Sequence, residues 1–245
     1  KDNYFFIILL CFLLVAKNLL LSDAYSQYGL TMTVGLFRLA FAVMFERTIP
    51  QFMKNTENVV LYRNKLLDTL IKFLVLLSVF QSFLPSVLAV GVLSLAAALL
   101  LLRWLIWRPH IGFRKFGNAT MYLGYLGLIL HFIFSALQLA ETWSFGTIAL
   151  HIFTLLCLGI VVPSMVVRVS QGHTGRKPQF LVSDKIAICF IFLSAIVRLL
   201  LPITLPAQYT TWVMTAGVFW SAAYLILGVR LVPFLFHARI DGKEH

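Results

Sequence analysis

Two histidines and one arginine lie inside long apolar runs, where ionisable side chains are rare: His131, His151 and Arg38. Charged and titratable groups in the hydrocarbon layer of a membrane are costly, so they usually face the interior of a helix bundle and mark a functional site. A neutral imidazole is a suitable ligand for haem iron or for copper. The alternative is that each ring hydrogen-bonds a neighbouring helix.

Arg38 lies about ten residues from the outer end of its apolar run, roughly 15 Å at the rise of an α-helix and near the middle of a bilayer. Its guanidinium cannot lose its proton. All nine carboxylates fall in loops or at the ends of apolar runs, so a local salt bridge is hard to supply. We therefore expect an anionic cofactor, a set of carbonyl groups or a water cavity to receive Arg38. Lys72, nearer a run end, is expected to reach water.

His131 shares a helix face with small and polar residues: Gly124, Gly127, Ser135 and Gln138. Small residues at this spacing let a neighbouring helix or a flat ligand approach closely, so we expect the His131 ring to point inward. The helices that carry His131 and His151 are joined by a short turn, and packed neighbours lie roughly 8–10 Å apart. That separation is too small for a haem clamped between both rings, so each histidine is expected to work with a partner on another helix.

Thr147 and Thr154 flank His151 by about one helical turn on each side. Either hydroxyl can hydrogen-bond the imidazole and fix its tautomer. Pro163 follows in the same apolar run, where a proline is expected to kink a helix.

The apolar runs that carry these residues are expected to form membrane-spanning helices. The chain has 245 residues, of which 60% are hydrophobic and 12% charged, and its mean hydropathy is +0.92, well above that of soluble domains. Apolar runs long enough to cross a bilayer recur along the chain. We expect an all-α, polytopic helix bundle in a single domain, residues 1–245. Its spans number about eight: 5–21, 28–45, 66–84, 87–106, 119–140, 145–167, 180–201 and 209–229.

The distribution of Lys and Arg predicts the orientation of this bundle, because these residues accumulate in cytoplasmic loops. Connections 22–27, 85–86, 141–144 and 202–208 contain no Lys or Arg, whereas four such residues lie in or beside each alternate connection. Both termini are therefore expected to face the cytoplasm. The formal net charge of +11 follows from this topology. It points to the lipid bilayer as a partner and not to nucleic acid.

The sequence contains no Walker loop, no GxSxG, no HExxH and no paired acids inside the apolar runs. No catalytic residue is assigned, and an enzyme is disfavoured. Cys11, Cys157 and Cys189 lie inside apolar runs and form no CxxC, which indicates core packing and neither disulfides nor a thiol metal site.

The segment HIFTLLCLGIVVPSMVVRVSQGHTGRKP, residues 151–178, resembles the NnrS family of bacterial inner-membrane proteins, whose hallmark is a His-Phe-Thr start and a Gly-His-Thr-Gly-Arg end to one helix. Two further segments agree with family elements: ERTIPQFMKN at 46–55, and YLILGVRLVPFLFHARIDGKEH at 224–245. His131 falls where the family has a histidine in the preceding helix. The resemblance covers most of the chain.

This resemblance implies a multi-pass protein of the bacterial inner membrane that holds haem b and copper and takes part in the response to nitric oxide and in protection from nitrosative stress. It carries the metal ligands onto His131, His151 and His173, and it makes nitric oxide the expected small-molecule ligand. Arg38 is the further cofactor-binding residue, expected from its depth in the membrane and not from the resemblance. Other family residues carry over onto Arg47, Pro50 and Arg176. Since family members have additional N-terminal helices, the chain is expected to be a C-terminal portion or a short homologue.

Two alternatives come from other classes of protein. A multi-span transporter, or a membrane protein that binds an anionic ligand or a lipid without a metal, would use Arg38 for its substrate and the histidines for structure. Transporters often have interrupted helices near the midplane of the membrane, and Pro163 is the candidate position. A structural subunit of a respiratory complex is the third hypothesis. The sequence leaves the oligomeric state open.

Overall fold

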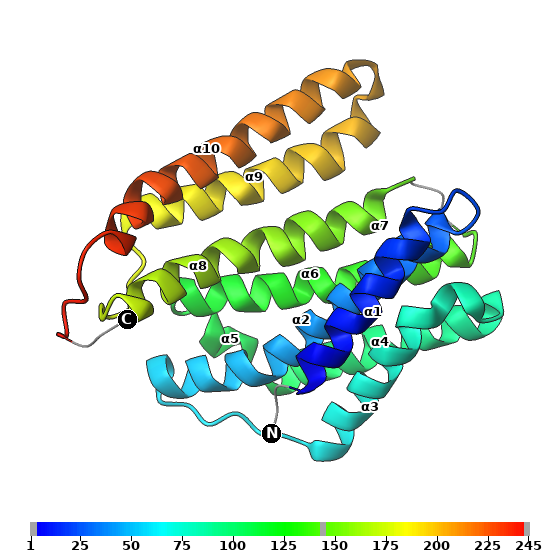
Figure 1. Ribbon diagram of the computed structural model, residues 1–245, viewed down its shortest axis with the longest axis horizontal. Helices are drawn as coiled ribbons and strands as arrows, with labels where there is room; N and C mark the ends of the chain where they lie inside the picture. The colour runs from blue at the N-terminus through cyan, green and yellow to red at the C-terminus, as the bar shows by residue number, and fades with distance from the viewer. Residues whose placement is uncertain (1–3, 143–145, 243–245) are drawn as a thin grey trace. The chain divides into compact units, whose positions relative to one another are not determined.

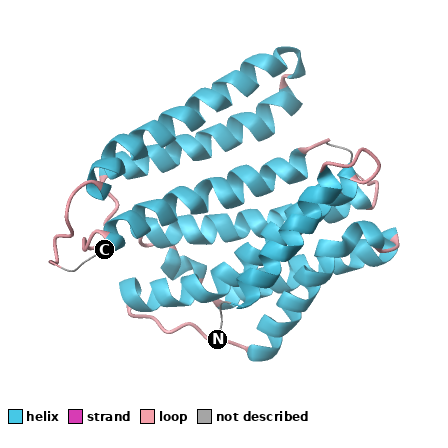
Figure 2. Cartoon of the chain, viewed as in Figure 1, coloured by secondary structure: helices cyan, strands magenta, loops and turns pink. Residues whose placement is uncertain are grey.

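The computed structural model describes residues 4–142 and 146–242, and every regular element in these ranges is a helix (Figure 2). The prediction of an all-α fold is confirmed. The chain divides into two compact units. The first comprises Lys1–Arg108 and Ile129–Gly146, and the second comprises Pro109–Leu128 and Thr147–His245. The expectation of one domain over the whole chain stays a prediction.

Seven helices in the described ranges are long and apolar enough to cross a membrane. They are Ser26–Glu57, Lys65–Phe83, Ser86–Ile106, Phe116–Leu139, Ile148–His173, Val182–Thr204 and Pro206–Leu235. The remaining predicted span coincides with α1, Tyr4–Leu20, which has 17 residues and is at the short end of the membrane-spanning range. The chain is a multi-pass membrane protein.

The first unit contains α1, α2 (Ser26–Glu57), α3 (Lys65–Leu77), the 3-10 segment η1 (Ser78–Phe83), α4 (Ser86–Ile106) and the second half of α6 (Phe116–Leu139). Helix α1 packs on α2 (Figure 1). A Cβ added at Gly29 of α2 would lie 2.7 Å from Leu20 Cα and 2.8 Å from Ala16 O. Only glycine fits this approach of two helix backbones.

Helix α2 is longer than the sequence indicated. The predicted span ended at Phe45, and the connection from Glu46 to Lys65 was expected to be a cytoplasmic loop with some helix. Helix α2 instead continues without a break to Glu57, with Pro50 inside it. It continues because Phe45, Ile49 and Met53 recur every four residues and are each at most 1% exposed, so one face of the extension is core. The helix ends where Asn58 adopts a left-handed φ of 54°.

The second unit contains α5 (Pro109–Gly112), the first half of α6, α7 (Ile148–His151), the π-helical segment η2 (Ile152–Leu158), α8 (Gly159–His173), α9 (Val182–Thr204), the 3-10 turn η3 (Pro206–Gln208) and α10 (Tyr209–Leu235). Helices α9 and α10 run side by side as a hairpin (Figure 1). One core cluster of this unit comprises Ile160, Val167, Ala187, Ile188, Ile191, Ala223, Leu227 and Leu231.

The long helix from Ile148 to His173 departs from α geometry before Pro163 is reached. Segment η2 closes with the Gly159 N–H donating to Thr154 O, five residues back, which is the π pattern. Pro163 follows four residues later, inside α8, where it has no N–H to offer the Gly159 carbonyl. π turns within α-helices are frequent at functional sites.

The cysteine prediction is right for one residue of three. Cys157 is buried, whereas Cys11 and Cys189 are exposed on the outer faces of α1 and α9. In a membrane-spanning helix an exposed thiol faces lipid as a small apolar side chain does, so the apolar sequence around these two cysteines did not require burial.

Candidate functional site

Arg38 lies in the interior of the first unit and is 3% exposed. Its Nε–H donates to His131 Nε2 at 2.7 Å, and its Nη1 and Nη2 donate to Gln81 Oε1 at 2.8 Å and to Ser135 Oγ at 3.2 Å. The Phe132 ring lies 5.2 Å from the guanidinium carbon, within cation–π range. The hydrogen bonds of Arg38 thus link α2 to α6 and to η1.

The acceptors of Arg38 are neutral side chains of the protein itself: His131, Gln81 and Ser135. Of the acceptors that the sequence left open, an anionic cofactor, carbonyl groups or water, the carbonyl is represented by the side-chain amide of Gln81. His131 and Ser135 are four residues apart and therefore share one face of α6. Gln81 comes from η1, where the helix breaks at Phe80 with φ −100° and ψ 18°. No carboxylate contributes to these contacts.

The hydrogen bond from Arg38 defines the state of the His131 ring. Because arginine is always protonated, Nε2 of His131 is the acceptor and a neutral ring carries its proton on Nδ1. A metal would need the same Nε2 lone pair. The ring is buried, at 2% exposure, as its helix face predicted. Its assignment as a metal ligand stays a prediction, and ligation through Nε2 would require Arg38 to move away.

His151 is the last residue of α7, directly before the π-helical segment, and is half-buried. Thr154 does not fix its ring, because the threonine hydroxyl donates to the Leu150 carbonyl at 3.1 Å and, at 3.5 Å, to the carbonyl of His151 itself. Within the described ranges no hydrogen bond to the His151 imidazole is found. Its ring nitrogens are therefore compatible with one axial bond to a haem iron.

The Gly-His-Thr-Gly-Arg motif forms the end of α8 and holds the C-terminal segment. Gly175 has φ +76°, a conformation that favours glycine. His173 is exposed, and its carbonyl accepts from Arg239 Nη1 at 2.8 Å. The Arg176 guanidinium lies 4.3 Å from the Phe234 ring. Hydrogen bonding to Asp241 raises the pKa of Arg239. These contacts explain the motif structurally, and His173 as a metal ligand stays a prediction.

The small residues beside His131 accept a helix and not a flat ligand. A Cβ added at Gly127 would lie 2.8 Å from both Cys157 N and Leu156 C, which are backbone atoms of η2. One turn earlier, a Cβ at Gly124 would collide with the Val161 side chain. The sequence left open whether these small residues admit a neighbouring helix or a flat ligand, and at Gly124 and Gly127 a helix packs closely against them.

A charged cluster inside the first unit was not predicted. Glu46 and Asp68 are 7% and 5% exposed, and Arg103 is 1% exposed. Glu46 Oε1 accepts from Arg63 at 3.0 Å and from Lys72 at 3.2 Å, and Asp68 Oδ1 accepts from Arg103 at 3.2 Å. Lys72 pairs with Glu46, and its side chain is also 41% exposed, as expected for a lysine near the end of an apolar run. One feature of the sequence does point to such a cluster: acidic and basic residues occur together on each side of the connection between α2 and α3.

Among the described residues no group of three or more His, Cys, Asp or Glu side chains is placed to hold a metal ion. A haem iron needs only one or two axial ligands, and copper binding stays a prediction. Of the three histidines predicted as ligands, His151 fits such an axial position best.

The helices and buried polar groups define an all-α, multi-pass membrane protein with an arginine–histidine pair in its apolar interior. A family model described as NnrS protein matches residues 1–239. The chain therefore belongs to the NnrS family, which confirms the resemblance seen in residues 151–178. Comparisons with curated proteins and with solved structures found no match.

Proposed function

We propose that this member of the NnrS family binds haem b through His151 in the bacterial inner membrane and protects the cell from nitric oxide. Ferrous haem binds nitric oxide tightly, so a haem held by one histidine would suffice to sense or scavenge it. Family membership supports the assignment, and no catalytic turnover is part of the proposal.

The observation that carries this proposal is the state of His151. Its ring is half-buried in a membrane-spanning helix, beside a π-helical segment, and has no hydrogen-bond partner within the described residues. An axial imidazole needs one nitrogen available to iron and a second that is protonated or hydrogen-bonded. His131, by contrast, already accepts from Arg38, so we assign it the role of holding Arg38 in the haem-free protein.

Copper is the second cofactor that the resemblance implies. His131 and His173 are the predicted ligands, and they would need additional groups to complete a site. Metal analysis of the purified protein, by mass spectrometry of the elements, tests this part of the proposal. Copper that is retained by the wild type and lost on replacing His173 by Ala would support it.

A visible spectrum tests the haem proposal directly. The protein is purified in detergent from cells supplied with a haem precursor. We expect a Soret band in the wild type that shifts on addition of nitric oxide and is lost in His151→Ala. His110→Ala is the matched control, because His110 is exposed and lies outside the predicted ligands. A wild-type preparation that is folded and colourless, or a full Soret band in His151→Ala, would overturn the proposal.

Protection of cells is the second measurement. Cells that produce the wild type or His110→Ala should resume growth sooner after exposure to a nitric oxide donor than cells that produce His151→Ala at equal membrane levels. Equal recovery of all three strains would contradict a protective role of the His151 site.

One observation favours a different function, binding of an anionic ligand without a metal, as in a multi-span transporter. Arg38 keeps its positive charge in the membrane interior, and its three hydrogen-bond acceptors are all neutral. An anion would neutralise that charge. Thermal stabilisation of the haem-free protein by a small carboxylate, abolished in Arg38→Gln, would support this alternative.

A further inference from the structure

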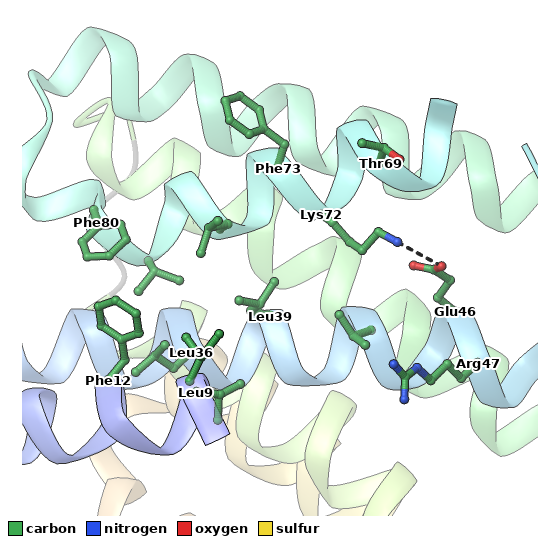
Figure 3. Close-up of a pocket in the computed structure, with 14 residues that line it drawn as sticks. Leu9, Phe12, Leu36, Leu39, Glu46, Arg47, Thr69, Lys72, Phe73 and Phe80 are labelled. Atoms are coloured by element: carbon green, nitrogen blue, oxygen red, sulfur yellow. Dashed lines mark hydrogen bonds and ion pairs between the residues drawn. The ribbon is translucent and has the colours of Figure 1, made fainter. Parts of the chain in front are cut away.

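An elongated cavity of about 530 Å³ lies in the first unit between α1, α2, α3 and η1 (Figure 3). Most of its lining is aliphatic or aromatic, including Leu9, Phe12, Leu36, Leu39 and Phe80. Because the unit is built from membrane-spanning helices, the medium available to fill an apolar cavity is the acyl chain of a lipid.

Polar and apolar linings are separated along the cavity. Figure 3 shows Phe12 and Phe80 at one end and Glu46, Arg47 and Lys72 at the other. Along α2, the lining runs from Leu36 to Arg47, which are eleven residue steps and so about 16 Å apart at helical rise. Half of a bilayer hydrocarbon core is about 15 Å thick. The cavity therefore has the length and polarity of a lipid from one leaflet.

The charged end carries an excess of cations. Lys72 Nζ lies 3.2 Å from Glu46 Oε1, and Arg63 Nη2 lies 3.0 Å from the same oxygen. Arg63 Nε also lies 3.8 Å from Asp68 Oδ2, and Arg103 Nη1 lies 3.9 Å from Glu46 Oε2. Two carboxylates are thus shared by three cations. Arg47 is exposed, and no ion pair or hydrogen bond of its guanidinium is found in the described part of the chain. An anionic headgroup placed between Arg47 and Lys72 would complement this charge.

The cavity is distinct from the proposed haem site. The lining residues that the structure describes include no His, Cys, Met or Tyr, the side chains that ligate haem iron. A lipid bound here and a haem bound at His151 are therefore independent proposals, and either can fail without the other.

We propose that the first unit binds one anionic phospholipid, with an acyl chain in the cavity between α1, α2 and α3 and its headgroup at Arg47 and Lys72. The predicted topology puts this charged end on the cytoplasmic side, so the lipid belongs to the inner leaflet. There the negatively charged headgroups attract basic side chains with about 1 kcal/mol for each Lys or Arg.

Native mass spectrometry of the delipidated protein, titrated with phosphatidylglycerol or phosphatidylcholine, tests the headgroup. We expect one retained phosphatidylglycerol and much weaker retention of phosphatidylcholine. Arg47→Gln should weaken retention of phosphatidylglycerol about fivefold, the ratio that corresponds to one lost cation. Lys54→Gln is the matched control, since Lys54 is an exposed cation of the same helix outside the cavity lining. Equal retention by the two variants would overturn the headgroup assignment.

Filling the cavity tests the acyl chain. Val43 lines the cavity and is 6% exposed, so Val43→Phe should abolish retention of phosphatidylglycerol. The control is Val229→Phe, because Val229 is 71% exposed and lies on α10 in the second unit. Melting temperatures identify variants that fail to fold. If Val43→Phe does not fold, Leu39→Phe replaces it as the cavity variant. Undiminished lipid binding by the folded cavity variant, or equal binding of soluble glycerol phosphate, would overturn the proposal.

Discussion

The Nε–H of Arg38 donates to Nε2 of His131 across 2.7 Å in the apolar interior of the first unit. The guanidinium brings a permanent charge into this interior, and the imidazole is one of three neutral acceptors that replace water around it. Hydrogen bonds gain strength where the local dielectric is low, and a donor left without an acceptor costs correspondingly more. The pair should therefore be energetically coupled.

His131→Ala should lower the free energy of unfolding by about 2 kcal/mol more in the wild type than in the Arg38→Gln background, the value of a hydrogen bond to a charged group. The comparison removes the cost of the cavity that alanine leaves, because both backgrounds incur it. Thermal unfolding in detergent, followed by circular dichroism, measures both differences. If the two substitutions prove additive, the 2.7 Å contact contributes no coupling and the pairing is wrong.

Asp68→Asn should destabilise the first unit by on the order of 3 kcal/mol, because it removes the nearest carboxylate of a buried guanidinium. Asp68 Oδ1 and Arg103 Nη1 are 3.2 Å apart, and the Arg103 side chain is 1% exposed. Arg63→Gln is the matched change in the same cluster. The Arg63 side chain is 50% exposed, so its loss should cost less than about 1 kcal/mol. Chemical unfolding measures both losses of free energy. If the two variants lose the same amount, burial does not determine how much each ion pair contributes to stability.

Local sequence patterns predicted the features that depend on one helix at a time. The apolar runs predicted the positions of the long helices. The small and polar residues that share a helix face with His131, such as Gly127, predicted that this face is buried. Both signals depend on helical spacing within about twenty residues. The motif residues 151–178 gave the family, because His-Phe-Thr and Gly-His-Thr-Gly-Arg flank one helix.

Features that depend on two distant segments were not predicted. Gln81 accepts from Arg38 in the 3-10 segment that follows α3 at Ser78, and no periodic pattern marks the change of helix type. Glu46 was expected to begin a connection that contains some helix, and no ion pair was predicted for it. The structure keeps it inside α2 because Arg63 and Lys72, 17 and 26 residues away, supply the opposite charges. Tertiary pairing overrides the local signal in both cases.

The two glycines of the Gly-His-Thr-Gly-Arg motif should respond oppositely to alanine. Gly175 has φ +76°, and a Cβ there would lie 2.8 Å from Asp241 Cγ in the C-terminal segment. Gly175→Ala should therefore lower stability by about 1–2 kcal/mol through backbone strain alone and loosen the contact between the C-terminal segment and α8. Gly172 lies inside α8, and a Cβ at this position meets nothing within 4 Å. Gly172→Ala should be neutral or stabilise the helix by up to about 1 kcal/mol.

Melting temperature and limited proteolysis of the C-terminal segment measure these two effects. We expect Gly175→Ala to melt earlier and to be cleaved faster near Arg239, because the bond from Arg239 Nη1 to the His173 carbonyl, 2.8 Å long, requires the turn at Gly175. Gly172→Ala should keep the wild-type cleavage rate. If both variants behave alike, the motif does not act through its left-handed turn, and its residues would have to be explained by a bound ligand.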